Sequence, residues 1–185
     1  MAEAARHDAW QAGDRYEAYM GRWSRQLAPR FLEWLRAPHG ARWLELGCGT
    51  GALSAAILTK CNPKSLISID PSEGFVKADR AMVLDPRVEF QVGDAQALRL
   101  ESGSRDAIAS TLVLNFIPDK QKAFAEMKRV VRPGGTVGYY VWDYPFPGKT
   151  NNIKPTTSRP ITTAAQIMPT MIGGERISAY RGRLT

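Results

Sequence analysis

The chain has 185 residues with 44% hydrophobic and 23% charged side chains, which suits one globular domain and excludes collagen-like, low-complexity and wholly disordered proteins. No apolar run approaches the ~18 residues of a membrane span, and the N-terminal residues contain no apolar signal segment, so we expect a cytoplasmic protein. Two cysteines and two histidines are poor material for a disulfide framework or a zinc site, so we expect no metal.

The net charge of +7 is concentrated near the C-terminus. Residues 149–185 hold six Lys and Arg residues and one acid, whereas residues 1–148 hold 19 basic and 17 acidic residues. Basic tails can bind nucleic acid or anionic lipid, but the nearly neutral body predicts that nucleic acid is not the partner. Prolines and Thr-rich stretches interrupt any helix or strand period after Pro145, so we expect an irregular basic tail there.

Apolar residues at helical spacing from Tyr16 to Trp34 predict an N-terminal helix. Pro29 either breaks this helix into two or lies in the first turn of the second one. Strands and helices then alternate, with strands predicted at 42–46, 65–69, 87–92, 106–114 and 136–142, and helices at 50–60, 73–83 and 119–131. Ser72 is a candidate cap for the second of these helices. This order, with near-continuous apolar strands, is typical of a doubly wound, mostly parallel α/β sheet. Such sheets bind ligands outside the carboxyl ends of their strands.

The segment ELGCGTG, residues 45–51, lies between a predicted strand and a predicted helix. Its glycines permit a tight turn and let a ligand approach the backbone, and free N–H groups at the helix start favour polar or anionic ligand groups. The same segment also passes the looser dinucleotide fingerprint. At this point the pattern is therefore open between nicotinamide dinucleotide and another adenosyl ligand.

Three acidic residues bear on the choice between a nicotinamide dinucleotide and another adenosyl ligand. Asp70 ends the second strand, where a carboxylate can accept both hydroxyls of a ribose. Asp94 follows the third strand and could accept the amine of adenine, while the Ala95 N–H donates to a ring nitrogen; a dinucleotide site has no fixed need for this acid. Glu45 would place a negative charge near the turn, which repels a pyrophosphate and attracts a sulfonium and an amine. For each acid the alternative is a turn or strand residue without a ligand.

Together these residues resemble the class I S-adenosylmethionine-dependent methyltransferases. WLELGCGTGALS (43–54) is similar to the first motif of the family, SIDPSEGFV (68–76) to the second, and VGDAQAL (92–98) to the adenine-recognition motif. LVLNFIPD (112–119) resembles the fourth-strand motif, and MKRVVRPGGTVGYY (127–140) the helix, turn and fifth strand beyond it. Residues 16–35 resemble the N-terminal cover of bacterial small-molecule methyltransferases.

The resemblance implies a Rossmann-like methyltransferase fold, S-adenosyl-L-methionine as cofactor, S-adenosyl-L-homocysteine as product, and a small-molecule methyl acceptor. It implies a floor of glycines under the methionine portion, Asp70 on the ribose, Asp94 with Ala95 on the adenine, and the Leu112 backbone on the cofactor amine. The full expected cofactor-binding set is Tyr19, Arg22, Glu45, Gly47, Cys48, Gly49, Asp70, Pro71, Asp94, Ala95 and Leu112. Cys48 is expected to pack in the turn rather than act as a nucleophile, and Asn115 either orients the acceptor or caps its loop.

The chain departs from the family at two places. Arg105 stands where the family has an aromatic residue opening the fourth strand, which predicts a looser edge. The family continues after the fifth strand with a helix and an antiparallel strand pair, whereas here only residues 176–180 predict at most one short strand. We therefore expect a sheet that lacks its last strands and whose exposed fifth-strand edge favours a homodimer.

These observations divide the chain into an N-terminal helical cover (1–40), a cofactor-binding Rossmann-like domain (41–145) and an irregular basic tail (146–185). The main functional hypothesis is a small-molecule methyltransferase. The alternatives are a cofactor-binding pseudoenzyme or truncated methyltransferase without a working acceptor site, and a nicotinamide-dependent oxidoreductase.

Overall fold

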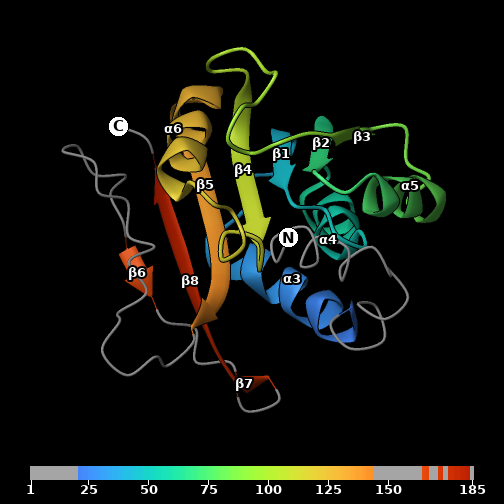
Figure 1. Ribbon diagram of the computed structural model, residues 1–185, viewed down its shortest axis with the longest axis horizontal. Helices are drawn as coiled ribbons and strands as arrows, with labels where there is room; N and C mark the ends of the chain where they lie inside the picture. Colours follow the sequence, from blue (N-terminus) through green and yellow to red (C-terminus); the bar gives the residue numbers. More distant parts are fainter. Residues whose placement is uncertain (1–20, 144–163, 167–170, 173–174, 184–185) are drawn as a thin grey trace, which may run out of the picture.

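The computed structural model describes residues 21–143, 164–166, 171–172 and 175–183, which form one sheet with helices on both faces (Figure 1). The helices are α3 (Arg22–Leu35), α4 (Ala52–Cys61), α5 (Glu73–Met82) and α6 (Lys120–Val130). The strands are β1 (Arg42–Leu46), β2 (Ser65–Asp70), β3 (Val88–Val92), β4 (Arg105–Thr111), β5 (Val131–Asp143), β6 (Ala164–Gln166), β7 (Met171–Ile172) and β8 (Glu175–Arg183). Helix α3 runs through Pro29 without a break, and residues 16–20 of the predicted helix lie outside the described residues.

The strands are hydrogen-bonded in the order β3-β2-β1-β4-β5-β8-β6, and β7 pairs with β8. All pairs among β1 to β5 are parallel, so that Glu45 of β1 lies beside Ser68 of β2 and Ala109 of β4. The chain winds outward from β1 in one direction and returns to continue at β4 in the other. The predicted doubly wound, mostly parallel sheet is therefore confirmed, and the reversal between β1 and β4 is where such sheets bind ligands.

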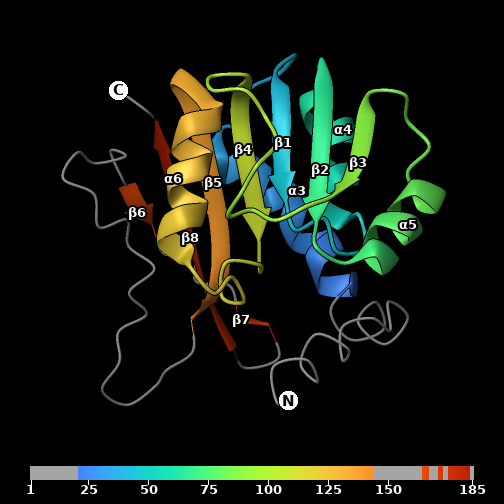
Figure 2. The ribbon, with the colours of Figure 1, turned by 45° about the horizontal axis from the view of Figure 1, so that its top comes forward.

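Alternating strand residues face two separate apolar cores, which explains why the strands read as near-continuous apolar runs. Helices α3 and α4 cover one face, over a buried cluster that includes Phe31, Trp43 and Ile57. Helix α6 covers the other face, over a cluster that includes Leu44 and Phe124 (Figure 2). The sheet is thus buried on both sides, and its ligand-binding edge is left at the strand ends.

Side-chain caps fix where two helices begin. The predicted cap Ser72 is confirmed, because its Oγ accepts a hydrogen bond from the Phe75 N–H of α5 at 3.4 Å. Asp119 caps α6 in the same manner, with its carboxylate accepting from the Lys122 N–H at 3.1 Å. These caps satisfy backbone donors that the first helical turn leaves free. They set the start of α5 directly after the carboxyl end of β2.

The C-terminal strand corrects two expectations. β8 pairs antiparallel with β5 over eight residue pairs, from Thr136 beside Arg183 to Asp143 beside Arg176. The expected irregular tail is therefore wrong for residues 175–183, and the β5 edge on which we based a homodimer is covered. The sequence ERISAYRGR hid this strand because polar residues interrupt its apolar alternation. Backbone hydrogen bonds to β5 stabilise this strand, although its sequence lacks a regular apolar alternation.

Contacts across the sheet tie β8 to the first described helix. Arg181 of β8 donates from Nη1 to the Trp34 carbonyl oxygen at 2.7 Å, and its guanidinium lies 5.2 Å from the centre of the Trp34 ring. The neighbouring Tyr180 stacks on Tyr139 of β5, with ring centres 5.0 Å apart. Hydrogen bonding and cation–π attraction thus join α3 to the strand that pairs with the outer edge of β5.

The pairing of β4 with β5 is irregular at the amino ends of these strands. The Pro133-Gly134-Gly135 turn is a bulge inside β5, because the pairing jumps from Arg105 beside Val131 to Ala107 beside Thr136. β4 begins at Arg105, beside this shift in pairing, and the following Asp106 accepts hydrogen bonds from the backbone and guanidinium of Arg42 and from Arg132. These guanidinium groups hold the pKa of Asp106 well below its usual range.

Candidate functional site

The turn from Gly47 to Gly51 connects β1 to α4 at the carboxyl edge of the sheet. Gly47 has a φ of +78°, and a Cβ at this position would lie 2.1 Å from a methyl carbon of Val113. A side chain is therefore excluded both by the backbone and by the segment that follows β4. The Gly47 N–H donates to the Ile69 carbonyl at 2.7 Å, so the turn is fixed to β2 as well.

Asp70 lies directly beside this turn. Its side chain is buried, and the two carboxylate oxygens accept hydrogen bonds from the Gly49 N–H at 3.1 Å and from the Ser72 N–H at 2.9 Å. The carboxylate thus connects the glycine turn to the start of α5. Pro71, the next residue, is exposed. The structure brings the predicted ribose acid within hydrogen-bond reach of the predicted glycine floor.

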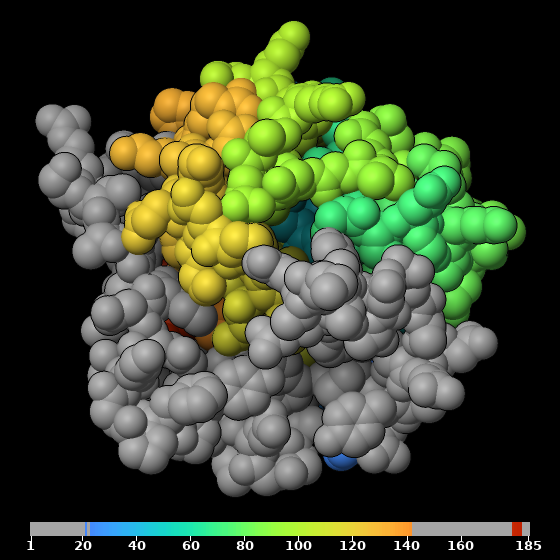
Figure 3. Space-filling model, viewed as in Figure 1, coloured from blue at the N-terminus to red at the C-terminus, as the bar shows by residue number. Residues whose placement is uncertain are grey.

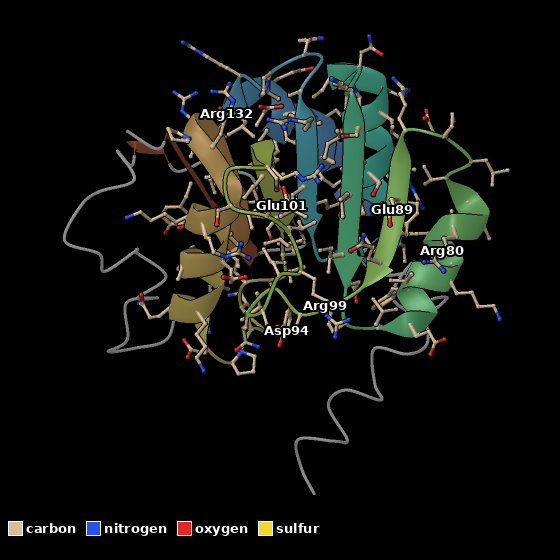
Figure 4. All side chains as sticks on the ribbon, turned by 90° about the horizontal axis from the view of Figure 1, so that it is seen from above. Arg80, Glu89, Asp94, Arg99, Glu101 and Arg132 are labelled. Carbon is tan, nitrogen blue, oxygen red and sulfur yellow. The ribbon has the colours of Figure 1, made fainter. Side chains whose placement is uncertain are left out.

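Asp94 lies after β3, next to the strand that carries Asp70, at the opposite end of the sheet from Arg132 (Figure 4). It is exposed and accepts hydrogen bonds from the Gln96 N–H at 2.8 Å and from the Gln96 side-chain amide at 3.0 Å. Gln96 in turn accepts from the Asp119 N–H at 3.0 Å. The loop that carries Asp94 and the half-buried Ala95 is thus anchored to the start of α6.

The space-filling surface is hollowed at this edge. A hollow opens between the green and the yellow segments of the chain, and blue-green atoms lie at its bottom (Figure 3). The green to yellow colours mark the chain after β2 through β4 and the loop that follows β4.

Glu45 corrects an electrostatic expectation. It is fully buried between β1, β2 and α4, and its Oε2 accepts hydrogen bonds from Ser54 and, at 2.7 Å, from Ser68. Burial raises the pKa of Glu45 to about 8, against the lowering effect of the two serines, while Asp79 and Asp70 add to the rise. Glu45 is thus mostly protonated at neutral pH, and the predicted charge that repels a pyrophosphate is wrong.

Cys48 points into the protein at the middle of the turn. It is buried against Val76 and Phe90, and Asp79 of α5 is the nearby carboxylate that contributes most to the electrostatics of its thiol. Burial, followed by the nearby carboxylates, raises the pKa of this thiol far above its ordinary value. Since the thiolate is the reactive form, Cys48 is a packing residue and not a nucleophile, as expected.

The segment after β4 closes the turn from the other side. Leu112 has a left-handed backbone with a φ of +60°, and its N–H donates to the Tyr140 carbonyl at 2.8 Å. Left-handed conformations are rare for residues other than glycine and concentrate at functional sites. Asn115 follows on the same segment and is half-buried. The chain bends here so that Val113 packs against Gly47.

The remaining predicted residues lie in or near α3. Tyr19 lies outside the described residues, and only the backbone of Arg22 is described, as the first residue of α3. Trp23 packs against the cluster that α3 shares with α4. In the described part of the chain, no helix is long and apolar enough to cross a bilayer. The same part contains no group of three His, Cys, Asp or Glu side chains that could hold a metal ion.

Comparison with known proteins decides the family. The family profile described as "Methyltransferase domain" matches residues 44–138, which include the glycine turn, both carboxylates and β4. The chain belongs to the class I S-adenosylmethionine-dependent methyltransferase family. This methyltransferase fold also accounts for the strand order found here, and neither the pseudoenzyme nor the oxidoreductase alternative is favoured.

Named relatives of this methyltransferase domain act on different acceptors. The chain is 34% identical over 99 residues to demethylmenaquinone methyltransferase of Clavibacter sepedonicus, covering 53% of this chain and 40% of that protein. It is 32% identical over 101 residues to trans-aconitate 2-methyltransferase of Deinococcus radiodurans, covering 55% of this chain and 38% of that protein. The chain therefore spans about two-fifths of the length of these relatives.

A solved structure with the same fold comes from Haloferax volcanii. It is the complex between the Trm112 methyltransferase activator and a candidate methyltransferase, and the match has a TM-score of 0.66 at 27% identity. The match covers 72% of this chain and 59% of that chain.

Sequence reasoning missed the residues that hold this methyltransferase site together. Ser54 and Ser68 lie 9 and 23 residues from Glu45, so no local spacing rule connects them. A serine in an otherwise apolar strand, as in SLISI, was the only available signal. The contact between Asp94 and Gln96 was easier to predict, because an Asp side chain commonly accepts a hydrogen bond from the backbone N–H two residues further along the chain.

Proposed function

We propose that the chain binds S-adenosyl-L-methionine at the carboxyl ends of β1 to β4 and transfers its methyl group to a small-molecule acceptor. The observation that carries this proposal is the position of Asp70, which is hydrogen-bonded to the glycine turn at the point where the winding of the sheet reverses. Adjacent strands lie about 4.8 Å apart. Asp70 at the end of β2 and Asp94 after the neighbouring β3 would together bind one nucleoside.

The donors and acceptors at this edge fit an adenosyl cofactor. Asp70, oriented by two backbone N–H groups, would accept from the ribose hydroxyls. Asp94 and the Ala95 N–H would bind the adenine edge. The turn glycines, with Cys48 between them, and Pro71 would line the nucleoside and methionine portions. The backbone of Leu112, which has a left-handed conformation, would accept from the cofactor amine.

When bound, the cofactor supplies a methyl group already activated by a sulfonium. The chain must then align the acceptor and exclude water, and proximity of this kind lowers a barrier by several kcal/mol. Asn115, half-buried after β4, would orient the acceptor. Tyr19 and Arg22, from the N-terminal cover of residues 1–40, would close the site over both reactants.

A small-molecule acceptor is supported by the named relatives, which act on demethylmenaquinone and trans-aconitate. The nearly neutral body of the chain argues against a nucleic-acid acceptor. We place the reaction in the cytoplasm, and we assign cofactor binding to residues 41–145.

The test is calorimetric titration with S-adenosylhomocysteine and with NAD. Asp70→Asn should weaken S-adenosylhomocysteine binding by at least about tenfold, because the ribose hydroxyls lose a charged acceptor. Asp85→Asn is the matched control, since each carboxylate accepts from the N–H two residues on at 2.9 Å, but Asp85 lies at the opposite end of β3. Equal binding by both variants, or a preference for NAD, would refute the assignment.

A further inference from the structure

The sheet ends at β3, and no described strand pairs with its outer edge. The Leu66 N–H of β2 donates to the Arg87 carbonyl, so the backbone groups of residues 87, 89 and 91 face β2. Because these directions alternate along a strand, the backbone groups of Val88, Phe90 and Val92 point outward. Exposed strand edges of this kind are templates for pairing with another chain.

Apolar surface gathers at both ends of this edge. Val92 at the carboxyl end is 56% exposed, and Leu84, just before the amino end, is 87% exposed. An open groove of about 420 Å³ lies beside the amino end, lined by Arg80, Val83, Leu84, Asp85, Val88, Glu89 and Phe90. An exposed apolar side chain thus stands at one end of the edge, and an apolar groove lies at the other.

We propose that the outer edge of β3 is a self-association surface, which pairs antiparallel with the same edge of a second copy about a two-fold axis at Phe90. This register pairs all five strand residues and places Val92 opposite Val88 of the second copy, over the apolar groove. The two-fold repeats the contact at the other end, as an isologous interface requires. A two-fold axis at Val88 would instead place Phe90 opposite Pro86 of the second copy, and an axis at Val92 would place Phe90 opposite Asp94 in the loop after the strand.

The charges on the opposite side of β3 agree with this register. Glu89 would lie opposite Gln91 of the second copy, and the two Glu89 side chains would not face each other. Within one chain the Gln91 side-chain amide already donates to Glu89 at 2.9 Å, so the same pairing is available between copies. Like charges directly opposite one another would have destabilised the ladder.

Arg80 limits this pairing. Its Nη2 donates to the Phe90 carbonyl, one of the outward-facing acceptors, and Arg80 and Glu89 lie at the same outer edge in Figure 4. The guanidinium therefore occupies the acceptor that a Phe90 N–H of a second copy would use. Pairing requires Arg80 to withdraw, which makes this side chain a brake on self-association.

Analytical ultracentrifugation over a concentration series tests the proposal. Val92→Lys should raise the dimer dissociation constant at least tenfold, and Arg80→Ala should lower it. Phe116→Lys is the matched control for self-association, because Phe116 is 54% exposed but lies after β4, away from this edge. Val92→Thr, which keeps a β-branched side chain, should weaken dimerisation less and guards against misfolding of the lysine variant. The proposal fails if the wild type and Arg80→Ala both stay monomeric, or if the Val92 variants match the control.

Disulfide trapping tests the register itself. Directly opposite residues of a non-hydrogen-bonded antiparallel pair have Cα atoms about 4.5 Å apart, within the range of a disulfide. Under a mild oxidant, Glu89→Cys mixed with Gln91→Cys should give a crosslinked dimer, whereas each variant alone should not. Equal crosslinking in the separate variants would overturn the two-fold at Phe90, and no crosslink in the mixture would do the same. The native Cys48 and Cys61 are buried and do not compete.

Discussion

Replacement of Gly47 by alanine tests the geometry of the cofactor turn in the most specific way. The new Cβ would lie 2.1, 2.7 and 2.8 Å from three side-chain carbons of Val113, and the backbone has a φ of +78°. A left-handed backbone costs a residue with a side chain about 1–2 kcal/mol. Overpacking costs a further 1–3 kcal/mol, approximately. We expect Gly47→Ala to lower the free energy of unfolding by roughly 2–5 kcal/mol and to weaken S-adenosylhomocysteine binding.

Gly40→Ala separates the two contributions. Gly40 also has a left-handed backbone, with a φ of +64°, but a Cβ there has no atom within 4 Å. It should therefore cost only about 1–2 kcal/mol in urea unfolding. Adding Val113→Ala to Gly47→Ala should recover part of the difference, because it removes both methyls and leaves the Val113 Cβ at 2.8 Å. Equal destabilisation by Gly40→Ala and Gly47→Ala would refute the predicted contact.

Two further predictions concern stability. With a pKa of about 8 for Glu45, the folded chain retains a proton that the unfolded chain releases above pH 4.5. The free energy of unfolding should therefore fall between these pH values, by at most about 1.4 kcal/mol per unit, and Glu45→Gln should flatten that slope in urea unfolding; an unchanged slope would contradict the assignment. Arg181→Ala should cost about 1–3 kcal/mol through the lost Trp34 contacts, against an exposed control such as Lys64→Ala, and no difference from that control would show that β8 is not held by α3.

Much of the fold could be predicted from the sequence because local patterns and tertiary packing agree in residues 41–145. The strands at 42–46 and 65–69 are buried on both faces, so their apolar runs predicted them almost to the residue. Ser72 revealed the start of α5 because capping is a local rule. Motif order along the chain then placed Asp70 and Asp94 at neighbouring strand ends, since parallel strands share one carboxyl edge.

The remainder depended on contacts that connect distant residues. β8 exists because it pairs with β5 and because Arg181 reaches Trp34 from 147 positions away, and neither partner is visible in a local window. The charge of Glu45 was misjudged for the same reason. Its pKa is set by burial under α4, which a strand pattern does not report. Long-range pairing and desolvation are therefore what sequence reasoning lacked here.

The most direct measurement is a crystal structure of the chain with bound S-adenosylhomocysteine. We predict the ribose on the carboxylate of Asp70, the adenine beside Asp94 and Ala95, and the homocysteine portion against the turn from Gly47 to Gly51. Electron density for the nucleoside at any other place on the protein, with both carboxylates still bound only to their present partners, would contradict the central claim.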